Sequence, residues 1–289
     1  MAQTLNWQTP TPLVYFAALV ADDEQIPLLE AAIAIAQDEM PQLDVLSVLH
    51  QVDSLSVTLK LRLPADAGTV QRLRALNHFF FNELGFAGNV NDFHDRRNSY
   101  LDQVLTRRLG IPITLAVLYI EFASQIGLKA SGVAFPGHFL VRIKMQQGDV
   151  VVDPFDGRSL SRDELDERLS PMRASLGLSD DQELPLAPFL QGVQARTILA
   201  RMLNNLKAIH RAAGDWPRLL AVSNRLVVLL PQSWEERRDR AHVHAQLRDF
   251  ARAADDLEAY LQHCPRADDA PAQRVHLARY RQADATPGP

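Results

Sequence analysis

The stretch Gly110-Ile111-Pro112-Ile113-Thr114-Leu115-Ala116 opens a run that stays largely apolar on every side as far as Ile126. A helix without a wide polar face is buried inside its domain. Proline is tolerated in the first turn of a helix, because the backbone N–H groups there have no helical partners. The stretch therefore predicts a buried central helix from Ile111 to Ile126 that is ended by Gly127.

Three short strands are predicted after this helix, at Ser131 to Phe135, His138 to Met145 and Asp149 to Asp153. In the second run, His138, Leu140 and Arg142 share one face, and the residues between them share the other. Since one of these faces is apolar, we expect a small antiparallel sheet with a core face.

Four sequence motifs carry a resemblance to a known family. They are Asn98-Ser99-Tyr100-Leu101, Arg107-Arg108-Leu109-Gly110-Ile111-Pro112, Phe135-Pro136-Gly137-His138-Phe139 and Asp153-Pro154-Phe155-Asp156-Gly157. With these motifs, residues 89–157 resemble the SirB-type transglutaminase-like family, a bacterial group joined to a helical repeat tail. The resemblance implies a papain/transglutaminase-like core, in which a buried helix packs against a small antiparallel sheet.

The resemblance also implies roles for individual residues. His138 matches the base of the superfamily, and Asp153 matches the group that orients it. The position of the nucleophilic cysteine falls on Pro112, which has no atom that could attack a carbonyl. Thr114 lies about 200° round the helix from Pro112, so its hydroxyl should point away from the pocket.

Two strand registers are compatible with the sequence. If His138 stands opposite Asp153, the hairpin loop spans about Lys144 to Gln147. If Gln147-Gly148 forms a two-residue turn instead, Asp153 faces Arg142 and lies roughly 13 Å along the strand from His138. The family resemblance favours the first register.

Helices are predicted for most of the first hundred residues. Asp22 is a candidate cap for a helix that continues to Ala36, and two further apolar stripes run over Leu46 to Leu59 and Val70 to Leu84. We expect Gly85 to end the third helix.

The C-terminal part repeats with a period of 34 residues. The matched pairs are Asp215 and Asp249, Trp216 and Phe250, Arg218 and Arg252, Val227 and Leu261, and Pro231 and Pro265. This is the tetratricopeptide period. Two repeats are clear, and a partial helix is expected from Ala272 to Tyr280.

The predicted fold class is therefore α+β and mainly helical. We expect a helical N-terminal region with the transglutaminase-like core over residues 1–175, a linker over 176–188, and tetratricopeptide-like helical repeats over 189–285. The repeats could bind a protein segment on a concave surface, or they could merely brace the core.

The composition excludes several classes of protein. A single cysteine fits a reducing cytoplasm, and a net charge of −5 argues against binding of nucleic acid through its phosphates. The apolar run from Pro12 to Val20 is preceded by no Lys or Arg, and no run is long enough to span a membrane, so we expect a cytoplasmic protein.

Polar residues near the core motifs are candidate ligand-binding residues. Arg107 or Arg108 could hold a carboxylate or phosphate, with Asn98 and Tyr100 in the lining; alternatively, these residues satisfy buried backbone groups. Asp92, His94 and Asp95 lie close together in the sequence, but no second cluster accompanies them, so we expect no metal and no cofactor.

Two functions remain open. The first is a non-catalytic adaptor that binds a protein or peptide through the repeats or the core cleft, with His138 and Asp153 as a vestige. The second is a hydrolase or transferase in which these two residues act as a general base without a covalent nucleophile. A filled site beside His138 would favour the adaptor, and an open cleft with converging polar groups would favour the enzyme.

Overall fold

The computed structural model describes residues 10–146, 148–178 and 184–285. Most of them lie in helices, and the strands form two small sheets, so the predicted mainly helical α+β class is confirmed. The chain divides into a core unit, Pro27–Ala36 with Leu43–Met202, and a repeat unit, Met1–Ile26 with Gln37–Gln42 and Leu203–Pro289. The predicted linker at 176–188 stays a prediction, since residues 179–183 lie outside the described ranges.

The core unit holds seven helices of the described chain and all six strands. The helices are α2 (Leu28–Ala34), α3 (Val45–Leu61), α4 (Thr69–Asn77), α5 (Leu101–Arg107), α6 (Pro112–Gln125), α7 (Arg162–Glu167) and α8 (Ser170–Ser175). The strands are β1 (Ala87–Gly88), β2 (Leu109–Gly110), β3 (Lys129–Val133), β4 (Leu140–Met145), β5 (Gly148–Val152) and β6 (Ser159–Leu160). Helix α9 (Ala195–Ala213) begins in this unit and ends in the repeat unit.

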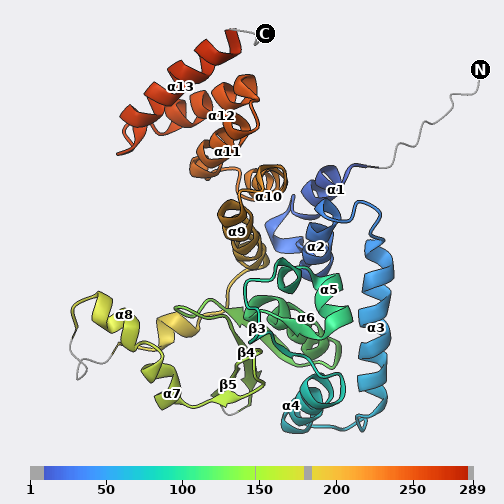
Figure 1. Cartoon of the computed structure of the whole chain (residues 1–289). Helices are drawn as coiled ribbons and strands as arrows, with labels where there is room; N and C mark the ends of the chain where they lie inside the picture. The colour runs from blue at the N-terminus through green and yellow to red at the C-terminus, as the bar shows by residue number, and fades with distance from the viewer. Residues whose placement is uncertain (1–9, 147, 179–183, 286–289) are drawn as a thin grey trace, which may run out of the picture. The chain divides into compact units, whose positions relative to one another are not determined.

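The central helix α6 forms as the sequence predicts and packs against β3 and β4 (Figure 1). Pro112 is its first residue, and the Thr114 hydroxyl accepts a hydrogen bond from the Ile111 N–H at 3.2 Å, which satisfies a donor that the helix leaves free. Gly127, with φ of +75°, follows its last turn. Ten residues of α6 are buried, which fits its lack of a polar face.

The N-terminal helices differ from the prediction in one place. Asp22 caps only a short 3₁₀ helix at Asp23–Gln25, and α2 begins after Pro27. Proline disfavours helical backbone in the residue before it, and Ile26 is extended with ψ of 114°. The third predicted helix is α4 continued by a π-helical turn, His78–Glu83, and Gly85 ends it with φ of +71°.

The larger sheet is antiparallel in the order β3-β4-β5-β6. Both predicted registers of the β4–β5 hairpin are wrong, because Met145 pairs with Gly148 and Val141 pairs with Val152. The sequence predicts that His138 lies within the strand, whereas β4 begins only at Leu140. Residue 147 lies outside the described residues.

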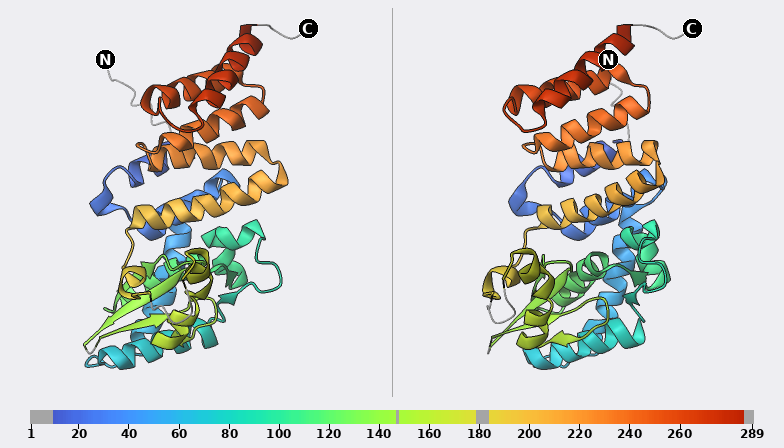
Figure 2. Two further views of the ribbon diagram at one scale, coloured as in Figure 1. Left: turned by 90° about the vertical axis from the view of Figure 1, so that its left-hand side faces the viewer. Right: turned by 60° about the vertical axis from the view of Figure 1, so that its left-hand side comes forward.

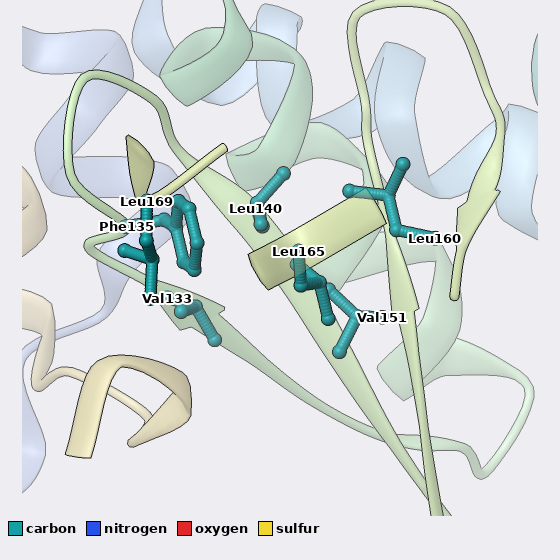
Figure 3. Packing of buried hydrophobic residues seen from close by; sticks show 7 residues of the cluster. All are labelled: Val133, Phe135, Leu140, Val151, Leu160, Leu165 and Leu169. Carbon is teal, nitrogen blue, oxygen red and sulfur yellow. The ribbon is translucent and has the colours of Figure 1, made fainter. Parts of the chain in front are cut away.

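Both faces of this sheet are covered. One face contributes Val133, Leu140, Val151 and Leu160 to a buried cluster that also contains Phe135, Leu165 and Leu169 (Figure 3). Leu165 belongs to α7, and Leu169 lies between α7 and α8, so apolar contacts hold this helical segment on the sheet. The alternate residues Val141, Ile143 and Val152 are buried as well.

The repeat unit is built from α1 (Pro12–Leu19), α10 (Trp216–Leu229), α11 (Trp234–Gln246), α12 (Phe250–His263) and α13 (Ala270–Ala285). Helices α10 to α13 stack in succession (Figure 2). The partial helix predicted from Ala272 to Tyr280 corresponds to α13, which extends beyond Tyr280 to Ala285. None of the helices in the described ranges is long and apolar enough to cross a membrane.

The 34-residue period has a local structural cause. Asp215 caps α10 by accepting from the Arg218 N–H at 3.3 Å, and Asp249 caps α12 by accepting from the Arg252 N–H at the same distance. The turns before these caps also match, since Gly214 and Arg248 have φ of +66° and +62°. The repeat in sequence is therefore a repeat of helix starts.

Candidate functional site

A tight turn between β3 and β4 presents His138. Its N–H donates to the Phe135 carbonyl at 3.0 Å, and Gly137 has φ of +70°, which favours glycine. The His138 carbonyl accepts from Nη2 of Arg201 at 2.9 Å. The guanidinium of Arg201 also lies 5.5 Å from the centre of the Phe139 ring. Helix α9 thus fixes the main chain on which the imidazole stands.

The structure brings His138 and Asp153 together although they are not paired in the sheet. Nε2 of His138 lies 2.8 Å from Oδ1 of Asp153, which directly follows β5. The same oxygen accepts from the Phe155 N–H at 3.0 Å, and Oδ2 accepts from Nη1 of Arg168 at 2.9 Å. Both carboxylate oxygens are therefore engaged.

Asp153 is ionised at neutral pH. Burial, which leaves its side chain 3% exposed, acts to raise its pKa, but the hydrogen bond and charge of His138 and the bonds from Phe155 and Arg168 outweigh burial. The resulting pKa of Asp153 lies below its ordinary value. The hydrogen bonds and the charge that favour the ionised carboxylate therefore outweigh, together, the effect of burial on the Asp153 pKa.

The ionised carboxylate fixes the tautomer of the imidazole. A carboxylate can only accept, so Nε2 of His138 must carry the hydrogen. In the neutral ring, Nδ1 then holds a lone pair, and no residue within the described ranges bonds to it. This nitrogen can accept a proton or a hydrogen bond from a ligand.

No nucleophile stands at the two positions considered on α6. Pro112 is buried and has no reactive atom. Thr114 is fully buried, and its hydroxyl lies 2.7 Å from the Asn98 carbonyl and 3.0 Å from that of Ile111, to which it can donate. The expectation that this hydroxyl is unavailable for attack agrees with these contacts. Cys264 belongs to the repeat unit.

Two of the four candidate ligand-binding residues lie in a hydrogen-bonded network. Asn98 is fully buried, and its Oδ1 accepts from Asn89 at 3.1 Å and from Nη1 of Arg107 at 3.3 Å. Nη2 of Arg107 is 3.3 Å from Oδ2 of Asp95. These contacts support the loop at 89–98, and a role of Asn98 or Arg107 in ligand binding stays a prediction.

The other two candidates are mostly covered by protein. Tyr100 is 4% exposed. Arg108 adopts a left-handed backbone with φ of +61° and lies 4.7 Å over the Phe86 ring. Burial lowers the pKa of Arg108. Their predicted contact with a ligand is likewise left as a prediction.

Aromatic side chains border the imidazole. The Phe155 ring meets the His138 ring edge to face, with centroids 6.5 Å apart, and Phe93 lies 6.2 Å from Phe155. Gly88 allows this arrangement, because a Cβ there would lie 2.2 Å from the Phe155 ring. The glycine at position 88 of β1 therefore leaves the space that the Phe155 ring occupies.

An open cleft of about 530 Å³ borders His138. Its lining is mostly polar or small: Pro136, Gly137, His138, Glu167, Arg168, Ser170 and Pro171. The volume is within the usual range of ligand pockets, about 300–1,000 Å³. The space beside the imidazole is thus not filled by side chains.

In the acidic cluster near His94, Asp95 is paired with arginine side chains of the same chain. Asp95 binds Arg97 and Arg107, and these contacts outweigh burial in lowering its pKa. Among the residues that the structure describes, no group of three or more His, Cys, Asp or Glu side chains is arranged to hold a metal ion.

Arg168 and Arg201 were not predicted from the sequence. Arg168 follows α7 and bonds Asp153, whereas Arg201 lies on α9 and bonds the His138 turn, so both come from segments further along the chain. Neither position belongs to a motif with a recognisable spacing. Only the tertiary structure shows that they hold Asp153 and His138.

The fold and the His–Asp pair define a transglutaminase-like core joined to helical repeats, and comparisons with known proteins agree. Residues 46–204 match the transglutaminase-like superfamily, and residues 206–278 match a tetratricopeptide repeat family. A UPF0162 protein of Xylella fastidiosa is 39% identical over 257 residues, which cover 89% of this chain and 90% of that protein. The chain therefore belongs to the UPF0162 family within the transglutaminase-like superfamily.

More distant relatives share parts of this arrangement. A UPF0162 protein of Vibrio cholerae is 27% identical over 245 residues, which cover 84% of this chain and 88% of that protein. F-box only protein 21 of the mouse is 42% identical over 86 residues, which cover 30% of this chain and 14% of that protein. No solved structure gives a significant match.

Proposed function

We propose that this protein is a non-catalytic transglutaminase-like adaptor that binds a protein or peptide. The observation that carries the proposal is Pro112 at the start of α6, where the superfamily pattern requires a thiol. The hydroxyl of Thr114, two residues on, is bonded to the backbone. Acyl transfer, peptide hydrolysis and cross-linking by a covalent route each need an activated nucleophile.

The rest of the chain supports an interaction role. Tetratricopeptide repeats stack helix pairs into surfaces that commonly bind protein segments. In an adaptor, the bonds from His138 and Arg168 to Asp153 keep the turn at 135–138 and the end of β5 in place beside the cleft. We assign the protein to the SirB-type group and to the cytoplasm as part of this proposal.

The second candidate function is general-base catalysis without a covalent intermediate. The open cleft favours it, and so does Nδ1 of His138, to which no residue in the described ranges bonds, since a positioned base can activate water or a substrate hydroxyl. Such a base contributes about 10²–10⁴-fold to a rate. The open cleft is the outcome expected for the enzyme, but the adaptor remains the leading proposal because Pro112 offers no nucleophile and only binding accounts for the repeats.

The two functions differ in what happens to the bound partner. We propose affinity capture from the native cell with the tagged full-length chain and with a His138→Ala variant, followed by intact-mass analysis of the captured protein. The adaptor predicts a partner recovered in stoichiometric amount and with unchanged mass in both cases. A change in partner mass that requires His138 would favour the enzyme, and the absence of any specific partner would contradict the adaptor.

A further inference from the structure

Helix α11 of the repeat unit carries two histidines that contact different neighbours. His242 and His244 are two residues apart, so their side chains lie about 200° apart round the helix axis. Nδ1 of His244 lies 3.5 Å from Oδ2 of Asp249, which caps α12. Nδ1 of His242 lies 3.0 Å from the hydroxyl of Tyr280 on α13. Protonation of both rings would therefore place a charge in two helix contacts of α11 at once.

The surroundings of His244 disfavour a charged ring. The residue is 5% exposed, and its Nδ1 has no hydrogen-bond partner among the described residues. The charged groups that face it are Arg240 of α11 and Asp249, Arg252 and Asp256 of the α12 segment. Burial is the largest cause acting on the pKa of His244, and this pKa lies below its ordinary value.

The two carboxylates beside His244 are already engaged by arginines. Asp249 accepts from the N–H of Arg252 at 3.3 Å and from its Nη1 at 3.0 Å. Asp256 accepts from Nε and Nη2 of Arg240, both at 2.7 Å. These carboxylates therefore compensate a charge on His244 only in part.

A second imidazole disfavours a charge on His242. The rings of His242 and His276 meet edge to face, with centroids 5.3 Å apart. Two like charges this close repel each other. Burial is the largest cause that lowers the pKa of His242, and the charge of His276 lowers it further. The other groups that face the ring are Asp239 and Arg238 of α11 and Gln273 of α13.

We propose that α11 is a pH sensor of the repeat unit, in which proton uptake by His242 and His244 in mildly acidic solution loosens α11 from α12 and α13. In the packed unit both rings are neutral, whereas in the loosened unit water surrounds them and they take up protons at their ordinary pKa. The loosened state therefore binds more protons, and its population rises as the pH falls through about 6.5. A partner held by the stacked helices would be released under the same conditions, a consequence that rests on the proposed adaptor function.

The expected size of the effect follows from the ordinary titration of histidine. An imidazole with a pKa of about 6.5 is about 10% protonated at pH 7.5 and about 90% protonated at pH 5.5. Each of the two histidines can thus shift the equilibrium toward the loosened state by up to about tenfold over this range. Carboxylates of ordinary pKa, about 3.9–4.3, stay ionised over the same range.

Hydrogen exchange of the full-length chain, resolved by peptide, tests the sensor between about pH 7.5 and about pH 5.5. After correction for the intrinsic pH dependence of exchange, we expect protection in α11, α12 and α13 to fall about fivefold to fiftyfold. In the double variant His242→Gln/His244→Gln, which lacks both rings, protection should change by less than about twofold. His263→Gln is the matched control, since it removes an exposed histidine of the same unit and should keep the fall.

A titration of the imidazole Cε1–H signals by proton NMR keeps the proposal testable if the double variant does not fold. The signals of His242 and His244 are assigned with the two single variants. We expect both to titrate in the unaltered chain with midpoints below about 6.5. Midpoints at or above this value, equal protection at both pH values, or a fall in protection that persists in the folded double variant would overturn the proposal.

Discussion

Asp153 is the residue that connects the parts of the candidate site. It bonds a turn through His138, a backbone N–H through Phe155 and the end of α7 through Arg168. Three donors on one buried carboxylate keep it ionised and keep the imidazole in one tautomer. The network is the same whether the site binds or catalyses.

Asp153→Asn should destabilise the folded chain in a pH-dependent way. The pKa of Asp153 lies below its unfolded value of about 3.9, so the ionised form stabilises the fold above that pH, and the effect is lost as pH falls through the lower folded-state pKa. We expect the free energy of unfolding at pH 7 to fall by about 2–4 kcal/mol, because Arg168 loses its charged partner. Urea unfolding at pH 7 and below about pH 3 measures this.

The control for this prediction is Asp66→Asn, which changes an exposed carboxylate and should lower the free energy of unfolding by less than about 0.5 kcal/mol. The difference in free energy of unfolding between Asp153→Asn and the unaltered chain should become smaller at the lower pH. A gap of constant size across this range would contradict the assignment of an ionised, stabilising carboxylate.

Pro112→Cys tests whether Pro112 occupies the nucleophile position. In a Cys264→Ser background, we expect iodoacetamide to alkylate the new thiol near neutral pH about tenfold faster with His138 than with His138→Ala, because the imidazole stabilises the thiolate. Ile113→Cys is the matched control, since its side chain lies about 100° further round the helix. Equal rates with and without His138 would show that position 112 does not face the imidazole.

At the scale of elements, periodicity was enough for the central helix, but it missed the break at Pro27 and was insufficient for strand pairing. The all-round apolar character of residues 111–126 predicted α6 and its burial correctly. Both predicted registers of the β4–β5 hairpin were wrong, because alternation of side chains identifies strand faces but not where a strand begins. His138 lies in a turn stabilised by Gly137, and its contact with Asp153 arises from side chains that extend beyond the paired region.

The candidate site was predictable only where a motif exists. His138, Asp153 and Pro112 were found through the family resemblance and lie in the core unit as expected. Arg168 and Arg201 approach from α7 and α9, and such tertiary contacts leave no periodic signal in the sequence. Asn98 belongs to one of the motifs, but the hydrogen bonds of its buried side-chain amide stabilise a loop.

Gly88→Ala should displace the Phe155 ring from its place over β1. A Cβ at position 88 would lie 2.2 Å from the ring, a clash that must be relieved by movement at a cost of about 1–3 kcal/mol. Proton NMR should show a shifted His138 imidazole signal, since the Phe155 ring lies edge-on to it. In Phe155→Ala the additional change Gly88→Ala should cost little, and additive effects would contradict the packing described.

At the scale of the molecule, the repeat unit includes residues from the N-terminal part of the chain. Asp38 binds Arg225 of α10 through both carboxylate oxygens, at 2.5 and 2.8 Å, and Arg225 is fully buried beneath the Phe16 ring. Only two repeats are clear in the sequence, and three or more are usually needed for stability. The N-terminal residues thus complete the core of this unit.

Arg225→Ala should therefore destabilise the repeat unit strongly. We expect about 2–4 kcal/mol, because the buried pair with Asp38 and the packing on Phe16 are both lost. Hydrogen exchange resolved by peptide should show the loss in α10 and in residues 10–26. Arg218→Ala, which removes a 43% exposed guanidinium paired with Asp215 and Glu39, should cost less than about 1 kcal/mol, and equal losses would contradict this account.

The most direct test of the whole account is a turnover measurement on the purified full-length chain. Amide hydrolysis and amine cross-linking of peptide substrates are followed by mass spectrometry for the unaltered chain and for His138→Ala. With Pro112 in place of a nucleophile, we predict no product above the uncatalysed background from either protein. Product formed by the unaltered chain and lost in His138→Ala would show a working active site and contradict the adaptor.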